Sequence, residues 1–167
     1  LSEQEGFPED QMCYVPGKDG KLELHPDWRR RTGYRAPSEV EWECACRAGT
    51  ITRRPFGHSD EFMSSYAWHK QNSLGRKRPV GLLLPNDLGL FDVLGNVDEW
   101  CLDHYHPFVD PRFSGAVLEA YRVVRGGNGG FLAALNTLRS AARTGNYMTM
   151  GIETQGMRLA RTLIRKP

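Results

Sequence analysis

The sequence lacks any apolar run long enough to cross a membrane, and it carries almost no excess of charge. A transmembrane helix needs about 20 consecutive apolar residues, whereas the leucines at 82–84 are followed at once by Pro85. The formal net charge is only +2, and the first six residues are too polar for a secretory signal. We therefore expect no membrane contact. We also expect the basic clusters at 29–31 and 76–78 to be solvated rather than to bind nucleic acid.

Cysteine is scarce, and its spacing suits neither a zinc site nor a disulfide framework. The four cysteines are Cys13, Cys44, Cys46 and Cys101, without a C-x-x-C pair. On the helix expected around them, Cys44 and Cys46 point to nearly opposite faces and cannot easily bridge. We therefore expect free, buried thiols, which are typical of a reducing compartment, and a cytoplasmic protein.

What the chain does contain is enough sequence for one domain with many turns. A length of 167 residues suits a single domain, which we expect to cover residues 1–167. The 18 glycines and 10 prolines predict loops and turns rather than long helices.

The clearest regular element is a predicted helix that begins after Ser38. Ser38 is a good N-cap, Glu41 completes a capping box three residues later, and Gly49 can end the helix. Its apolar surface is expected from Val40, Trp42, Ala45 and Cys46, extended by Cys44 and Ala48.

Strands are predicted in the second half of the chain. Residues 121–125 are β-branched, aromatic or basic and precede two glycines, as at the end of a strand. Two further strands are predicted at 138–143 and at 155–162.

Three glycine-punctuated motifs occur in order along the chain. They are DVLGNVDEWC at 92–101, RGG at 125–127 and GMRLA at 156–160, and they follow TGYRAPSEVEWE at 32–43. These motifs resemble the sulfatase-modifying-factor family, which includes the formylglycine-generating enzymes. The resemblance implies an α+β, C-type-lectin-like fold with one main helix, a small antiparallel sheet and long ordered loops.

The resemblance covers only part of the family domain. That domain normally opens with an M-V-x-I-P-G-G-x-F strand and an E-V-T-x-x-Y segment, neither of which occurs in this sequence. We therefore expect the chain to begin partway into the domain and to represent its C-terminal portion. Because a missing strand exposes a sheet edge, we expect another chain or segment to complete it.

The copper site of the family oxidases has no counterpart in this sequence. Those enzymes bind Cu(I) through two thiolates between the R-G-G and R-x-A-x-R strands, as soft Cu(I) requires. The corresponding segment, 128–138, contains no cysteine. Cys101 matches a buried cysteine of the family and does not replace the lost ligands. We expect no copper cofactor and no catalytic residue.

A cation site is predicted at the glycine-asparagine loop. Asn96, Asp98 and Glu99 place three oxygen-bearing side chains within four residues, as Ca²⁺ sites do. The resemblance implies the same, because the family enzyme uses this loop at a calcium site. The alternative is a structural turn in which Asn96 caps backbone N–H groups and Glu99 pairs with an arginine.

The segment 128–155 is predicted to display a binding surface. It follows no helical or strand period, and it mixes tyrosine, asparagine, glycine and methionine as antibody loops do. The resemblance includes the variable proteins of diversity-generating retroelements, which vary this region. The alternative is that its apolar side chains fill the core. The expected ligand-binding residues are Asn128, Phe131, Asn136, Thr144, Asn146, Tyr147 and Met150.

The leading functional hypothesis is a non-catalytic module that binds a protein or a small ligand through residues 128–155. One alternative is a formylglycine-generating oxidase that acts on a substrate cysteine, or a related iron-dependent oxygenase partner. The other is an accessory or regulatory domain of a larger kinase or protease.

We expect the chain to bind no stoichiometric Cu(I) and to form no formylglycine in a peptide that carries the sulfatase motif. The reason is the absence of thiols from residues 128–138. Copper titration and mass spectrometry of the peptide check this. Aldehyde product at catalytic turnover would contradict it.

Overall fold

The computed structural model describes residues 1–106, 121–127, 130–147 and 153–163. The chain divides into two compact units. The larger unit is Ser38–Met157, and the smaller unit combines Leu1–Pro37 with Arg158–Pro167. Within the described ranges, no helix is both long and apolar enough to span a membrane.

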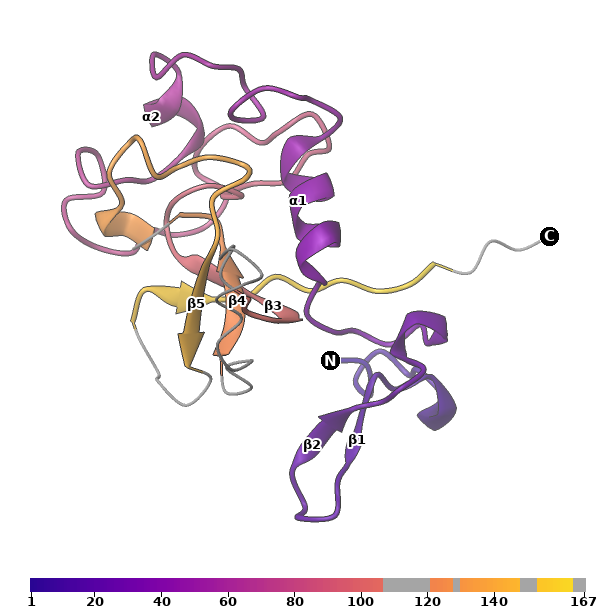
Figure 1. The fold of residues 1–167 in the computed structure, drawn as a ribbon. Helices are drawn as coiled ribbons and strands as arrows, with labels where there is room; N and C mark the ends of the chain where they lie inside the picture. Colours follow the sequence, from indigo (N-terminus) through magenta and orange to yellow (C-terminus); the bar gives the residue numbers. More distant parts are fainter. Residues whose placement is uncertain (107–120, 128–129, 148–152, 164–167) are drawn as a thin grey trace, which may run out of the picture. The chain divides into compact units, whose positions relative to one another are not determined.

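The smaller unit is built around a short antiparallel hairpin of β1 (Tyr14–Pro16) and β2 (Leu22–Leu24) (Figure 1). Two 3-10 turns flank it, η1 (Glu9–Gln11) and η2 (Trp28–Arg30). The guanidinium groups of Arg29 and Arg35 lie 4.4 and 4.3 Å from the Trp28 ring centre. Cation–π contacts therefore supply part of the packing in a unit with few buried apolar side chains.

The larger unit begins with α1 (Glu39–Arg47), and its start confirms the predicted capping box. The Ser38 hydroxyl accepts the Glu41 backbone N–H, and the Glu41 carboxylate accepts the Ser38 N–H at 2.8 Å. At the other end Ala48 takes the left-handed conformation, with φ of 49°, directly before Gly49. Gly49 follows with φ of 87°, so the helix ends before the glycine that was predicted to stop it.

The buried face of α1 is narrower than predicted. Trp42 and Cys46 are 1% and 0% exposed, and they form one stripe at four-residue spacing. Val40 is 71% exposed and Cys44 is also exposed, so the prediction that they extend the apolar face was wrong. Two residues along a helix turn the side chain by about 200°, which places these residues opposite the buried stripe.

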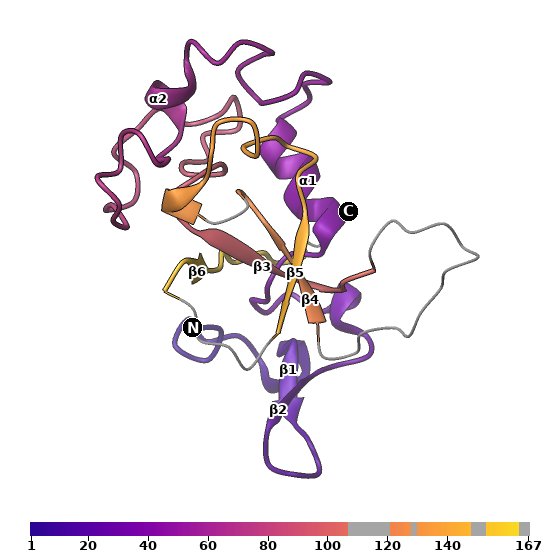
Figure 2. The ribbon, with the colours of Figure 1, turned by 60° about the vertical axis from the view of Figure 1, so that its left-hand side comes forward.

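A four-stranded sheet packs beneath α1, in the order β5-β4-β3-β6 (Figures 1 and 2). The β3–β4 and β4–β5 pairs are antiparallel, and β3 pairs with β6 in parallel. The strands are β3 (Asp98–His104), β4 (Tyr121–Arg125), β5 (Thr144–Tyr147) and β6 (Gln155–Gly156), and a short α2 (Met63–Tyr66) and η4 (Gly130–Leu132) lie outside the sheet.

The strand predicted at 121–125 is confirmed as β4, whereas the other two predicted ranges were wrong. Residues 138–143 form turns, because the Leu138 carbonyl accepts from the Arg54 side chain and the Ser140 N–H donates to the Arg53 carbonyl. The strand starts only at Thr144. The range 155–162 keeps two strand residues in β6, and Ala160 forms an isolated bridge within the smaller unit.

We expect Trp42→Ala to lower the free energy of unfolding by about 3–5 kcal/mol, because a fully buried aromatic ring is lost. Ser38→Ala should lower it by about 1 kcal/mol through loss of the cap. Val40→Ala is the matched control on the same helix and should change it by less than about 0.5 kcal/mol. Urea denaturation measures all three, and an unchanged Trp42→Ala midpoint would refute the packing.

Candidate functional site

The glycine-asparagine loop is held by protein groups at the residues predicted to bind a cation. The Asn96 carboxamide accepts the Arg78 N–H and donates to the Arg78 carbonyl, both at 3.0 Å. One Glu99 carboxylate oxygen accepts the Trp42 indole N–H at 2.6 Å. Asn96, Asp98 and Glu99 are all buried. Among the described residues, no group of three histidine, cysteine, aspartate or glutamate side chains is placed to hold a metal ion.

This arrangement fits a structural turn better than an oxygen cage. Asn96 uses both ends of its carboxamide on one backbone residue, and Glu99 anchors the buried Trp42 ring. The Asn96 contact with the Arg78 N–H agrees with the turn hypothesis, whereas the Glu99–arginine pair that it also expected stays a prediction. Calcium binding also stays a prediction to be tested.

The residues predicted to bind a ligand are distributed over two parts of the larger unit. Phe131 lies in η4 and is 8% exposed, so it belongs largely to the core. Asn136 is exposed on the loop that follows. Thr144, Asn146 and Tyr147 lie on β5, whereas Asn128 and Met150 fall outside the described residues.

The loop after η4 lines an open pocket of about 320 Å³. Its position is set by Arg54, which is 0% exposed and donates to the carbonyls of Leu135 and Leu138 at 3.1 and 2.8 Å. Arg54 also pairs with Asp60 at 2.6 Å. Arg53 joins the same two segments, because its side chain donates to the Asn136 carbonyl at 3.3 Å. The lining residues are Asp60, His69, Lys70, Gln71, Ala133, Ala134, Leu135 and Asn136.

His69 lines the pocket with its ring buried, and its hydrogen bonds indicate which ring nitrogen carries the hydrogen. Burial lowers the pKa of His69, so the ring is neutral near pH 7. Its Nδ1 accepts the Gln71 N–H at 3.3 Å, which assigns the ring hydrogen to Nε2, 3.1 Å from the Ser64 hydroxyl. A base that activates a serine needs a lone pair on that nitrogen. This pair is therefore not arranged for nucleophilic catalysis.

The β5 residues form a strand where a loop surface was predicted. Side chains alternate along a strand, so Tyr147 and Gly145 face one side while Thr144 and Asn146 face the other. Tyr147 is 41% exposed and packs on Tyr121 of β4, with ring centres 4.1 Å apart. Gly145 is required beside it, because a Cβ there would lie 2.3 Å from the Tyr105 ring. The three predicted β5 residues thus do not share one face.

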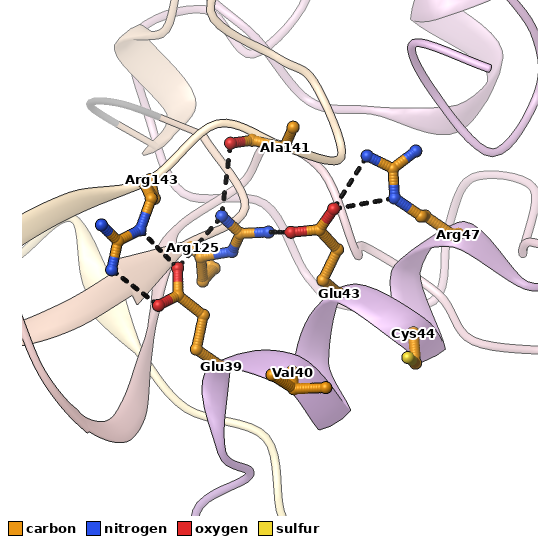
Figure 3. A pocket seen from close by; sticks show the side chains of 8 residues that line it. All are labelled: Glu39, Val40, Glu43, Cys44, Arg47, Arg125, Ala141 and Arg143. Atoms are coloured by element: carbon orange, nitrogen blue, oxygen red, sulfur yellow. Dashed lines mark hydrogen bonds and ion pairs between the residues drawn. The ribbon is translucent and has the colours of Figure 1, made fainter. Parts of the chain in front are cut away.

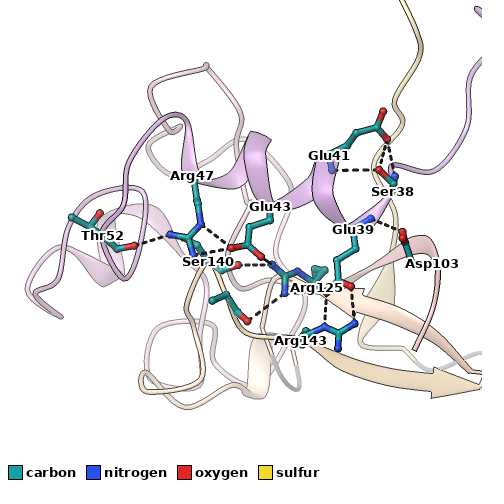
Figure 4. A network of polar contacts seen from close by, with 11 residues as sticks. Ser38, Glu39, Glu41, Glu43, Arg47, Thr52, Asp103, Arg125, Ser140 and Arg143 are labelled. Atoms are coloured by element: carbon teal, nitrogen blue, oxygen red, sulfur yellow. Dashed lines mark hydrogen bonds and ion pairs between the residues drawn. The ribbon is translucent and has the colours of Figure 1, made fainter. Parts of the chain in front are cut away.

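A second pocket, of about 460 Å³, opens between α1 and the turn before β5 (Figure 3). Its charged residues pair with one another (Figure 4). Arg125 is 1% exposed and contacts Glu39 at 3.3 Å, Glu43, and the Ser140 carbonyl at 2.7 Å. Arg143 lies 2.6 Å from Glu39 and Arg47 lies 2.8 Å from Glu43. This network joins α1 to the sheet. It also pairs the carboxylates of Glu39 and Glu43 with arginines, so neither carboxylate is left alone in the pocket to act as an acid or a base.

Sequence reasoning missed Arg54 and His69 because neither belongs to a periodic pattern. Arg54 precedes Pro55, and His69 follows Trp68 in a turn-rich stretch. Their partners lie up to 84 residues away along the chain, so only the folded structure shows them.

The profile of the Sulfatase-modifying factor enzyme 1-like domain matches residues 9–163. The chain belongs to this family. The formylglycine-generating enzyme of Streptomyces coelicolor is 31% identical, over 92% of this chain and 56% of that enzyme. The serine/threonine-protein kinase pkn1 of Chlamydia pneumoniae is 32% identical, over 89% of this chain and 27% of the kinase.

Among solved structures, Treponema denticola variable protein 1 is similar, with a TM-score of 0.71 and 27% identity. The match covers 94% of this chain and 57% of that protein. The α+β fold of the family is therefore shown. The chain spans about half the length of the formylglycine-generating enzyme it matches.

The four cysteines are free, and none of them lies within residues 128–138 of the sequence. Burial raises the pKa of the Cys101 thiol, so it stays protonated. Cys13 is also buried and its pKa is raised for the same reason. Cys44 is exposed, which corrects the expectation that all four thiols are buried.

If the Asn96 loop binds Ca²⁺, the melting temperature should rise with added Ca²⁺ and fall with chelator. A ligand at about 100 times its Kd stabilises the folded state by roughly 2.7 kcal/mol. The hydrogen bonds of Asn96 and Glu99 lead us to expect a curve that does not respond. A calcium-dependent shift that Asp98→Asn removes would instead establish the cation site.

Proposed function

We propose that this chain is a non-catalytic binding module, and that the 128–155 segment forms the main part of its binding surface. The observation that carries this proposal is the pocket of about 320 Å³ beside η4. Half of its lining residues come from 133–136, and exposed Asn136 lies among them. Pockets that combine apolar walls with a few polar groups are the usual form of ligand sites.

The chemistry of the pocket supports binding rather than oxidation. A Cu(I) site needs two thiolates, and residues 128–138 contain no cysteine. The neutral His69 ring directs its Nε2–H toward the Ser64 hydroxyl, so it has no lone pair there to accept the serine proton and make a nucleophile. The likeness to formylglycine-generating enzymes therefore supports the shared fold more strongly than it supports a shared reaction.

A second candidate function is an accessory domain of a larger protein. It is favoured by the match to the Chlamydia pneumoniae kinase, which places this kind of domain within about a quarter of that chain. An accessory domain also acts by binding. Its binding surface would be constant, whereas a display module like the variable protein would have a surface that varies between copies of the gene.

The likeness to a variable protein gives a direct test, which is to sequence this gene from many members of its source population. We expect substitutions to concentrate in the codons for residues 128–158, at exposed positions such as Asn136 and Tyr147. Arg54 and Arg125 should stay constant, because each holds several backbone carbonyls or carboxylates.

The same variation has a control within the chain. Leu88 is 62% exposed but lies outside the segment, so it should change no more often than other surface positions. A constant 128–158 segment without a neighbouring reverse transcriptase gene would refute the variable-display form of the proposal. Asn136 conserved with the rest of the pocket would then favour the accessory domain.

A further inference from the structure

The segment 70–77, which begins at Lys70 in the wall of the η4 pocket, carries an exposed leucine with a positive φ. Leu74 is 76% exposed, and its φ of 57° lies in the left-handed region that non-glycine residues rarely adopt. Such a residue costs roughly 1 kcal/mol or more, which other contacts must offset.

Ser73 fastens this strained residue to the pocket wall. Its side chain is 0% exposed, and its hydroxyl donates to the Phe131 carbonyl at 2.9 Å. The same oxygen accepts the Gly75 N–H at 3.3 Å. Leu74 follows Ser73 along the chain, and Leu132 follows Phe131 and is 52% exposed. The Ser73–Phe131 hydrogen bond therefore joins the two backbone segments that carry these exposed leucines.

The charge along the same segment is basic. Lys70 lines the pocket, and Arg76 and Lys77 follow on the exposed chain after Gly75. Few acidic side chains offset this charge in the neighbouring stretch 60–64. Asp60, which also lines the pocket, is paired with Arg54, and Glu61 is the other acidic residue there. A bound segment with negative charge would therefore be complementary to Lys70, Arg76 and Lys77.

We propose that the occupant is an acidic peptide segment of a partner protein, with a large apolar side chain that contacts Leu74 and Leu132. Its carboxylates pair with Lys70, Arg76 and Lys77. This inference rests on the proposed binding function and adds the chemical class of the partner. The apolar contact supplies affinity, while the three basic side chains raise the association rate.

The probes are two fluorescent synthetic peptides of equal length, one alternating glutamate and leucine and the other alternating lysine and leucine. The acidic peptide should bind the full chain at least about tenfold more tightly at low salt, and the difference should shrink as salt is added. Equal binding of both peptides, stronger binding of the basic one, or no binding of the acidic one would overturn the proposal.

Leu74→Gly is the decisive variant, because glycine relieves the positive φ while removing the side chain. We expect an equal or higher melting temperature together with about tenfold weaker binding of the acidic peptide. Leu88→Ser is the matched control, since Leu88 is a similarly exposed leucine on the turn that Asn86 fastens to the end of α1. It should leave binding unchanged.

The charge contribution is tested by the double variant Arg76→Glu and Lys77→Glu, which should slow association about tenfold and reverse the salt dependence. The exchange Arg76→Lys with Lys77→Arg keeps the charge and should bind like the parent chain. Ala134→Trp fills the pocket and tests the proposed site itself. If Ala134→Trp abolishes binding while Leu74→Gly and the double variant do not, the pocket stands and the acidic-partner inference fails. If no variant changes binding, both fail.

Discussion

The buried guanidinium of Arg54 holds together the part of this protein that lacks regular structure. It donates to the carbonyls of Leu135, Leu138 and His58 and pairs with Asp60. A loop inside a protein must satisfy its carbonyls, and one fully charged fork can satisfy several of them at once. Without it, the carbonyls of Leu135, Leu138 and His58 would each lose a hydrogen bond from the guanidinium group.

Arg125 repeats the same solution between helix and sheet. It lies at the end of β4 and contacts both Glu39 and Glu43, which are one helical turn apart on α1. A short sheet with one main helix buries little apolar surface, so directional contacts to charged groups determine how its parts fit. The same contacts engage the acidic side chains of the larger pocket, which leaves the η4 pocket as the better candidate for a ligand.

Several motifs that this chain shares with the sulfatase-modifying factor family hold its backbone in place. The shared motifs form the capping box, the Gly95–Asn96 turn and the end of β4, all of which are architectural here. Gly95 is one example, because a Cβ at that position would lie 2.1 Å from the Trp68 carbonyl oxygen. The oxidase chemistry depends instead on two thiols in a loop, and a loop can change without disturbing this frame.

Sequence alone determined the features that depend on neighbours along the chain. The Ser38–Glu41 capping box and the strand at 121–125 are of this kind, since each needs only a few adjacent residues. The tertiary structure decided the rest. It placed a strand at Thr144–Tyr147 rather than at 138–143, turned Val40 to solvent and buried His69. These outcomes depend on hydrogen bonds and packing between distant segments, such as Arg54 with Leu138, which no local pattern of residue types encodes.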